Sequence, residues 1–165
     1  MLSSDRTDVG LYSIFEDGNF VRSIDNLTEL NLSDMATFYI GCSYGFEEAM
    51  VKSGIKLAHY RPGGCVGTYL SGISNYPVGN IGDTMVMTMR PIKREQLEAA
   101  YNISGALEGA HGAPVHMGDP QLIGVDLQKP LLGSAPDGIP EIAEDEIPVF
   151  WGCGTTSCIA GITGS

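Results

Sequence analysis

The segment His111–Pro120 restricts the fold of this chain more than any other part of the sequence. Pro114 has no amide proton, and Gly112 and Gly118 lose much backbone entropy when they are ordered, so the segment cannot be helical. We therefore expect an ordered loop here, or a short strand flanked by turns. The segment also holds two of the three histidines, whose side chains exchange protons near neutral pH. If the chain performs acid–base chemistry, we expect it here first.

The composition is that of a globular chain. Its 165 residues are 43% hydrophobic with a mean hydropathy of +0.05, which suits one domain with a sizeable core and argues against disorder. The net charge of −11 disfavours nucleic acids and anionic membranes as partners, because an acidic surface repels both. The sequence has no apolar run of membrane-spanning length and begins without the apolar core of a secretory signal, so we do not expect secretion.

The cysteines favour neither a disulfide framework nor a metal centre. No two of them form a CxxC pair, and the chain does not look secreted, so we expect reduced thiols. We also expect no metal ion and no other cofactor. The four are Cys42, Cys65, Cys153 and Cys158.

Hydrophobic periodicity and turn residues predict alternating strands and helices. Residues 60–82 are rich in Gly, Pro, Ser and Asn, which indicates irregular loop or strand edges, and residues 121–125 begin another small element. The first two expected strands, 11–15 and 20–21, are joined as a hairpin by the Asp17-Gly18 turn. Further strands are expected at 35–42, at 84–89 ending at Arg90-Pro91, and from 147 to a glycine-lined turn at 152–154. The expected helices are 43–54 and 93–107.

This alternation predicts the α/β class, as a layered α/β/α sandwich with a smaller α+β subdomain. We expect a single region over 1–165, with the subdomain within 55–110. In such sheets ligands bind beyond the carboxyl ends of strands. Three expected strands end in residues suited to binding: Cys42-Ser43, Arg90 and Cys153-Gly154-Thr155.

His111, His116 and Asp119 allow three interpretations. His116 could transfer a proton while Asp119 orients it, as in acyl chemistry. The three side chains could instead bind a metal ion, although the histidine spacing is not that of a helical zinc motif. In the third interpretation Asp119 caps a turn before Pro120 and the histidines only satisfy loop backbone groups.

The other candidate groups would bind anions. A helix beginning at Cys42-Ser43 would present amide protons to a carboxylate or an oxyanion, and would lower the pKa of a thiol. Arg90 could hold a carboxylate in a bidentate contact or form an ordinary surface ion pair. The glycine-lined turn around Gly154 and Thr155 resembles an anion-binding nest. A capping serine, a buried small residue and an ordinary turn are the alternatives.

Four segments together resemble one family, the DUF1445 hydro-lyases, which includes the mitochondrial D-glutamate cyclase of animals. The resemblance runs in order through nearly the whole chain. Its segments are 38–49 (FYIGCSYGFEEA), 87–92 (MTMRPI), 111–120 (HGAPVHMGDP) with Ile123-Gly124, and 148–155 (PVFWGCGT).

The resemblance implies the layered α/β fold and closure of D-glutamate to 5-oxo-D-proline and water, by a chain located in the mitochondrial matrix or the cytoplasm. As hypotheses for that reaction, His116 with Asp119 and His111 would transfer protons, and Arg90 would hold the α-carboxylate. Cys42 and Ser43 would hold the oxyanion, and Gly154 and Thr155 would help bind the substrate. A non-catalytic module that binds amino acids, and a metal-dependent hydrolase, are the alternatives.

Departures from the family pattern accompany the resemblance. Gly45 replaces a serine, which weakens the helix cap modestly, and Gly64–Gly72 replaces a stretch that supplies an arginine and an asparagine. Because the family has further segments at both ends, we expect this chain to be incomplete. Uncovered sheet edges and apolar faces would then favour association into a homo-oligomer or marginal stability.

Overall fold

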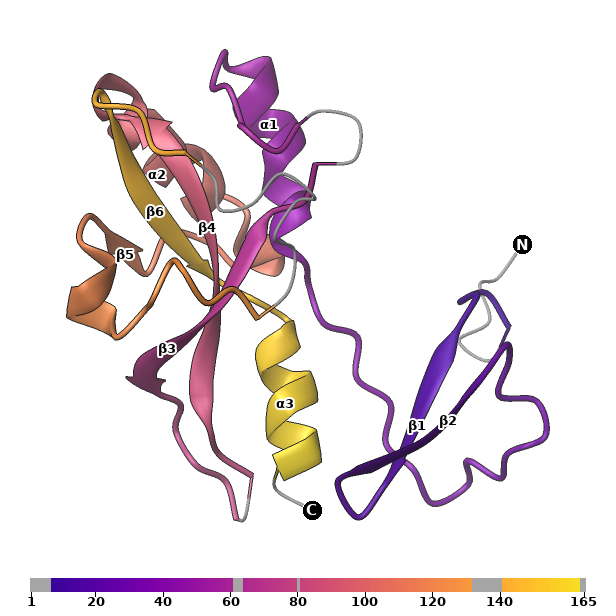
Figure 1. The fold of residues 1–165 in the computed structure, drawn as a ribbon. Helices are drawn as coiled ribbons and strands as arrows, with labels where there is room; N and C mark the ends of the chain where they lie inside the picture. Colours follow the sequence, from indigo (N-terminus) through magenta and orange to yellow (C-terminus); the bar gives the residue numbers. More distant parts are fainter. Residues whose placement is uncertain (1–6, 61–63, 80, 132–140, 164–165) are drawn as a thin grey trace.

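A computed structural model describes residues 7–60, 64–79, 81–131 and 141–163 (Figure 1). Its centre is a four-stranded sheet in the order β3-β4-β6-β5, in which every neighbouring pair is antiparallel. The strands are β3 (Gly67–Ser74), β4 (Thr84–Lys93), β5 (His116–Met117) and β6 (Glu146–Gly152).

A separate hairpin precedes the sheet, as predicted. Strands β1 (Tyr12–Glu16) and β2 (Asn19–Ile24) pair antiparallel. The turn residues Asp17 and Gly18 both have positive φ, 48° and 75°, which matches the twist of a tight two-residue hairpin turn. The hairpin projects to one side of the sheet and an extended stretch of chain joins the two (Figure 1).

Two helices pack on one face of the sheet, and both were predicted. The first begins as the 3-10 turn η1 (Ser43–Phe46), continues as α1 (Glu47–Lys52), and stops before Gly54, whose φ is +86°. The second is η2 (Arg94–Gln96) followed by α2 (Leu97–Gly105). Their apolar side chains form a core with sheet residues. Its buried members are Phe46, Met50, Ile55, Leu57, Ile92, Ala100, Val149 and Trp151.

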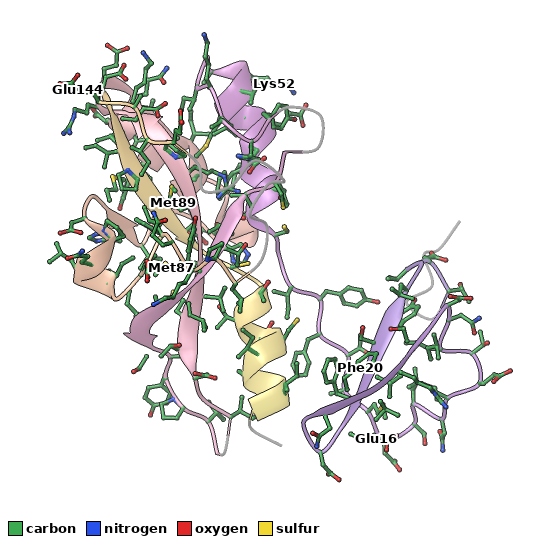
Figure 2. All side chains as sticks on the ribbon, viewed as in Figure 1. Glu16, Phe20, Lys52, Met87, Met89 and Glu144 are labelled. Atoms are coloured by element: carbon green, nitrogen blue, oxygen red, sulfur yellow. The ribbon has the colours of Figure 1, made fainter. Side chains whose placement is uncertain are left out.

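The opposite face of the sheet is covered mainly by irregular chain and the 3-10 turn η4 (Pro120–Ile123). Met87 and Met89 of β4 lie near the middle of the sheet (Figure 2) and are buried on this face with Phe150, Ile123 and Val125. A further 3-10 turn, η3 (Glu108–Ala110), follows α2, and helix α3 (Thr155–Thr163) follows β6 and contacts β4. The α/β class is confirmed, with an antiparallel sheet.

Two strand predictions were wrong. Residues 35–42 form no strand, and Phe38 and Tyr39 are 81% and 83% exposed. An apolar run becomes a strand only if a neighbouring strand pairs with it. Conversely, β3 (Gly67–Ser74) lies within the stretch assigned to loops or strand edges, because pairing with β4 outweighs its low strand propensity.

Strand β4 does not end at Arg90-Pro91 but runs on to Lys93. Pro91 stands opposite Pro148 of β6, and the Pro148 carbonyl accepts a hydrogen bond from Gly118 on the other side. This pair therefore occupies a non-hydrogen-bonded position, where neither missing amide interrupts the β4–β6 ladder.

Two further observations concern the predictions made from composition. All four cysteines are free thiols. Within the described ranges, no helix combines the length and the apolar character needed to cross a bilayer. The subdomain expected within 55–110 stays a prediction.

Candidate functional site

Three of the motif segments meet beside the start of α3. A Cβ added to Gly41 would lie 2.0 Å from the carbonyl oxygen of Gly109, and one added to Gly154 would lie 3.3 Å from the carbonyl oxygen of Gly41. Only glycine permits the first approach without displacing backbone. The chain at residues 40–42 thus passes between the loop before His111 and the turn that leads into α3.

A cavity of about 360 Å³ lies at this junction. Such a volume suits a small ligand, since binding pockets measure roughly 300–1,000 Å³. The turn between β3 and β4 forms its second wall. The lining side chains are the apolar Ile40, Val78, Ile81 and Ala160 and the polar or aromatic Asn75, Tyr76, Asp83, His111, Cys153, Thr156 and Ser157, together with Gly82 and Gly154.

Two buried polar atoms in residues that line this cavity have no hydrogen-bond partner among the residues that the structure describes: Nε2 of His111 and Nδ2 of Asn75. Leaving such a group unpaired costs about 1–3 kcal/mol of folding free energy, and such groups are therefore few in folded proteins. His111 also has a φ of +77°, a conformation that non-glycine residues seldom adopt. Both residues line the cavity, so a ligand that reached these two atoms would supply the missing partner.

Hydrogen bonds with Val86 of β4 hold the start of helix α3 against the sheet beside the cavity. The hydroxyl of Thr156 accepts a hydrogen bond from the amide of Val86 at 3.0 Å, and the amide of Cys153 donates to the carbonyl of Val86 at 2.9 Å. The start of a helix carries a partial positive charge. Gly154, Thr156 and Ser157 bring that end of α3 to the cavity wall.

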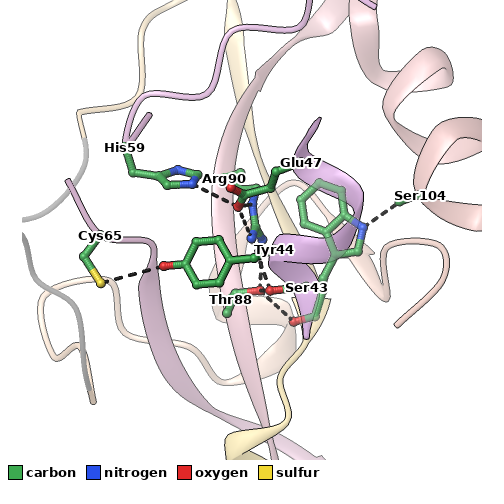
Figure 3. A network of polar contacts seen from close by, with 9 residues as sticks. Ser43, Tyr44, Glu47, His59, Cys65, Thr88, Arg90 and Ser104 are labelled. Atoms are coloured by element: carbon green, nitrogen blue, oxygen red, sulfur yellow. Dashed lines mark hydrogen bonds and ion pairs between the residues drawn. The ribbon is translucent and has the colours of Figure 1, made fainter. Parts of the chain in front are cut away.

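Arg90 lies in a separate buried network (Figure 3). Its guanidinium is 0% exposed and forms an ion pair with Glu47, donating from Nε to Oε1 at 2.8 Å. It also donates to the hydroxyls of Thr88 at 3.0 Å and Ser43 at 3.2 Å. His59 contacts the same Glu47 oxygen at 2.9 Å.

The network keeps its charges although it is buried. Burial alone would raise the pKa of Glu47, but the hydrogen bond with His59 and the charge of Arg90 outweigh burial and lower it. Burial lowers the pKa of Arg90, and Glu47 opposes that shift. The guanidinium carbon lies 4.9 Å from the Phe46 ring centroid and 5.4 Å from that of Trp151, so aromatic faces complete its surroundings.

The other predicted site residues lie in different places. Ser43 is buried in the Arg90 network, whereas Cys42 is exposed. The His116 ring contacts the main-chain oxygen of Asp119 at 2.8 Å, while the Asp119 carboxylate caps η4 by accepting from the Gln121 amide. Thr155 accepts a 3.3 Å hydrogen bond from the Cys153 thiol.

Of the eight predicted site residues, the structure places two, His111 and Gly154, on the cavity wall, and two others, Arg90 and Ser43, in the buried network. In the part of the chain that is described, no three His, Cys, Asp or Glu side chains gather as metal ligands. Reasoning from sequence missed Asn75, which lies in the stretch assigned to loops or strand edges, and Asp83, which directly follows that stretch. It also missed the pairing of Glu47 with Arg90.

Comparison with known proteins agrees with these motifs. The sequence profile described as D-glutamate cyclase matches residues 36–163, a range that includes both the cavity and the Arg90 network. The chain belongs to the D-glutamate cyclase family. The matched range includes the sheet, its helices and the cavity, and begins after the hairpin.

Several relatives carry the name "Putative hydro-lyase". One from Cupriavidus taiwanensis is 41% identical over 152 residues, covering 92% of this chain and 55% of the relative. One from Aliivibrio salmonicida is 42% identical over 150 residues, covering 90% and 56%. One from Acinetobacter baylyi is 42% identical over 154 residues, covering 92% and 56%. This D-glutamate cyclase-family chain spans about half the length of the curated relatives it matches.

Proposed function

We propose that this chain carries the substrate cavity of a hydro-lyase that closes D-glutamate to 5-oxo-D-proline and water. Membership of the D-glutamate cyclase family and the names of the relatives support the reaction class. One observation carries the assignment to this cavity: the buried, unpartnered Nε2 of His111 at its wall. Because this nitrogen has no partner among the described residues, it would be left for a ligand, and a histidine can exchange protons with one.

The reaction needs proton transfer and a stabilised oxygen. The amino nitrogen attacks the γ-carboxyl carbon, forming the new C–N bond, and one carboxyl oxygen then leaves as water. Two protons leave the substrate ammonium group and two join the departing oxygen, so the reaction needs no oxidant or reductant. His111 would accept a proton from the nitrogen and return one to the leaving oxygen.

The surroundings suit these roles. Ile40, Val78 and Ile81 give the cavity an apolar wall, and an apolar environment favours the neutral amine that is able to attack. The start of α3, which reaches the cavity wall through Gly154, Thr156 and Ser157, would hold the α-carboxylate by its partial positive charge. A contact of Thr155 with substrate stays a prediction.

The Arg90 network would act from outside the cavity. Arg90 bonds Glu47 and Ser43, and so fixes η1 directly after the segment 40–42 that lines the cavity. A direct contact of Arg90, Cys42 or Ser43 with substrate, and proton transfer by His116 with Asp119, stay predictions.

Incubation with D-glutamate tests this proposal. We expect 5-oxo-D-proline to form faster than in protein-free buffer, as measured by chiral chromatography with mass detection, and we expect L-glutamate to react more slowly. If no product forms above the spontaneous rate, the proposed reaction is wrong. If D-glutamate or 5-oxo-D-proline then still raises the melting temperature, the chain is a binding module for amino acids.

A further inference from the structure

We propose that the side chain of Asn75 is the oxyanion donor of this site. Its Nδ2 would donate a hydrogen bond to the γ-carboxyl oxygen that becomes negative when the amine adds to the carbon. This inference rests on the proposed function and adds to it a residue outside all four family-like segments.

The backbone around Asn75 holds this side chain in place. Asn75 directly follows β3, and its amide donates to the carbonyl of Asp83 at 2.9 Å. Two further hydrogen bonds, of 2.8 and 3.1 Å, join Val78 and Ile81 in both directions. The turn between β3 and β4 is therefore a short continuation of the ladder, and such a support fixes a donor before the substrate arrives.

The donor itself is desolvated and unused. Nδ2 of Asn75 is buried and has no acceptor within the described part of the chain, and the residue lines the same cavity as His111. A fixed, buried N–H group stabilises a developing negative oxygen much more than an N–H group in bulk water does. A proton-transferring nitrogen and an unused amide donor on one cavity are the two parts that acyl addition needs.

The charges in the cavity favour a neutral group in the ground state. Asp83 lines it, with its carboxylate accepting from the Thr84 amide at 2.7 Å, and no Lys or Arg is among the lining residues that the structure describes. Asp83 would repel an ionised γ-carboxylate and favour the neutral carboxyl group that an amine can attack. Negative charge then appears only as the C–N bond forms.

Asn75 would contact the same oxygen at two stages of the reaction, during attack by the amine and in the product. During attack the carbonyl electron pair moves to this oxygen, which Nδ2 holds. When the C–O bond to the other oxygen breaks, the pair returns and the carbonyl of the lactam forms. Asn75 should therefore also recognise the 5-oxo group of the product.

Kinetics of Asn75→Ala and Asn75→Asp test the catalytic role. We expect kcat to fall about 10²- to 10³-fold, with the KM for D-glutamate changed by only a few fold. The melting temperature of Asn75→Ala should not fall, because this substitution removes a buried group that has no partner among the described residues. Asn102→Ala, on the exposed surface of α2, is the matched control and should keep wild-type kinetics. A KM increase with unchanged kcat, or full activity of Asn75→Ala, would overturn the inference.

Binding of 5-oxo-D-proline and D-proline, which differ at the carbonyl group, separates this inference from the proposed function. Calorimetry should show that the wild-type chain prefers 5-oxo-D-proline and that Asn75→Ala loses the preference. If this holds but D-glutamate is not cyclised, the proposed reaction fails and recognition of the lactam carbonyl by Asn75 stands. Equal binding of the two ligands by the wild type, no binding of either, or a preference that persists in Asn75→Ala, would refute the inference.

Discussion

At the scale of single residues, the most consequential interaction of this chain is the ion pair between Glu47 and Arg90. Both side chains are almost fully buried, at 2% and 0% exposure. Burying two charges is costly, and removing one partner leaves the other uncompensated, which typically destabilises by about 3–5 kcal/mol. The pair joins the start of α1 to strand β4, and neither partner can be removed without leaving the other charge buried.

Glu47→Gln tests how strongly the free energy of unfolding depends on this ion pair. We expect a loss of about 3–5 kcal/mol in the free energy of unfolding at neutral pH, measured by denaturant titration. Glu48→Gln is the matched control, because Glu48 is the neighbouring acid and forms only an exposed pair with Lys52. A loss of similar size in both variants would show that the burial of Glu47 is not what matters.

The pH dependence follows from the lowered pKa of Glu47. A carboxyl whose pKa is lower in the folded chain stabilises the fold above its ordinary value, here 4.5, and loses that contribution as the pH falls through the folded value. The stability difference between wild type and Glu47→Gln should therefore be largest near neutral pH and shrink below about pH 4.5. Melting curves from pH 7 to pH 3 measure it, and a difference that grows toward acid would contradict this sign.

Residue identities could be predicted only in part. The histidine loop and the glycine turn before α3 stood out by composition, and one residue of each, His111 and Gly154, lines the cavity. Arg90 was singled out as a charge at a strand end, but its burial depends on Glu47 lying opposite, 43 positions away in sequence. Asn75 could not be predicted as a site residue, because an isolated asparagine in a Gly- and Ser-rich stretch is typical of a turn.

At the scale of elements, the close crossing of residues 40–42 and the loop before His111 shapes the site. The carbonyl of Gly109 occupies the place where a Cβ of residue 41 would be. Any side chain there must push one segment away from the other, and the wall of the cavity contributed by Ile40 would move with it.

Gly41→Ala should therefore destabilise the chain by roughly 1–3 kcal/mol, as other overpacked sites do, and weaken binding of 5-oxo-D-proline. Gly161→Ala is the contrasting variant, since Gly161 lies within α3 with open space around it. It should stabilise by up to about 1 kcal/mol through helix propensity. Thermal melts of both variants check the pair, and a Gly41→Ala chain as stable as wild type would refute the close approach.

Elements with strong local signals were predicted correctly, as were the strands at 84–89 and from 147, whereas the predictions for 35–42 and 67–74 were wrong. The Asp17-Gly18 turn and the apolar spacing of 93–107 act within a few residues, so the sequence alone was enough. Whether 35–42 or 67–74 becomes a strand depends on where β4 lies. That is decided by contacts remote in sequence, which a single sequence does not reveal.

At the scale of the whole molecule, the chain consists of a layered sheet body and a hairpin beside it (Figure 1). Both large cores belong to the body, whereas Phe15 and Phe20 of the hairpin contact each other and remain 42% and 58% exposed. Two strands without a core are at best marginally stable in water. Association into homo-oligomers stays a prediction at this scale.

Hydrogen exchange should reveal this difference in stability. Amides of β4 and β6, the two inner strands of the sheet, should exchange slowest, and those of β1 and β2 should exchange faster by several orders of magnitude. Exchange monitored by mass spectrometry of peptides checks this expectation. Protection of the hairpin equal to that of β4 would mean that it is held by contacts beyond the pair.

The most direct test of the proposed site compares the two histidines of the loop in one assay of 5-oxo-D-proline formation from D-glutamate. His111 lines the cavity with an unpartnered nitrogen, whereas the His116 ring already contacts a main-chain oxygen. We predict that His111→Ala lowers kcat about 10²- to 10⁴-fold, the usual contribution of a general acid–base group, and that His116→Ala keeps activity within a few fold of wild type. Full activity of His111→Ala, with activity lost in His116→Ala, would contradict the assignment of this cavity.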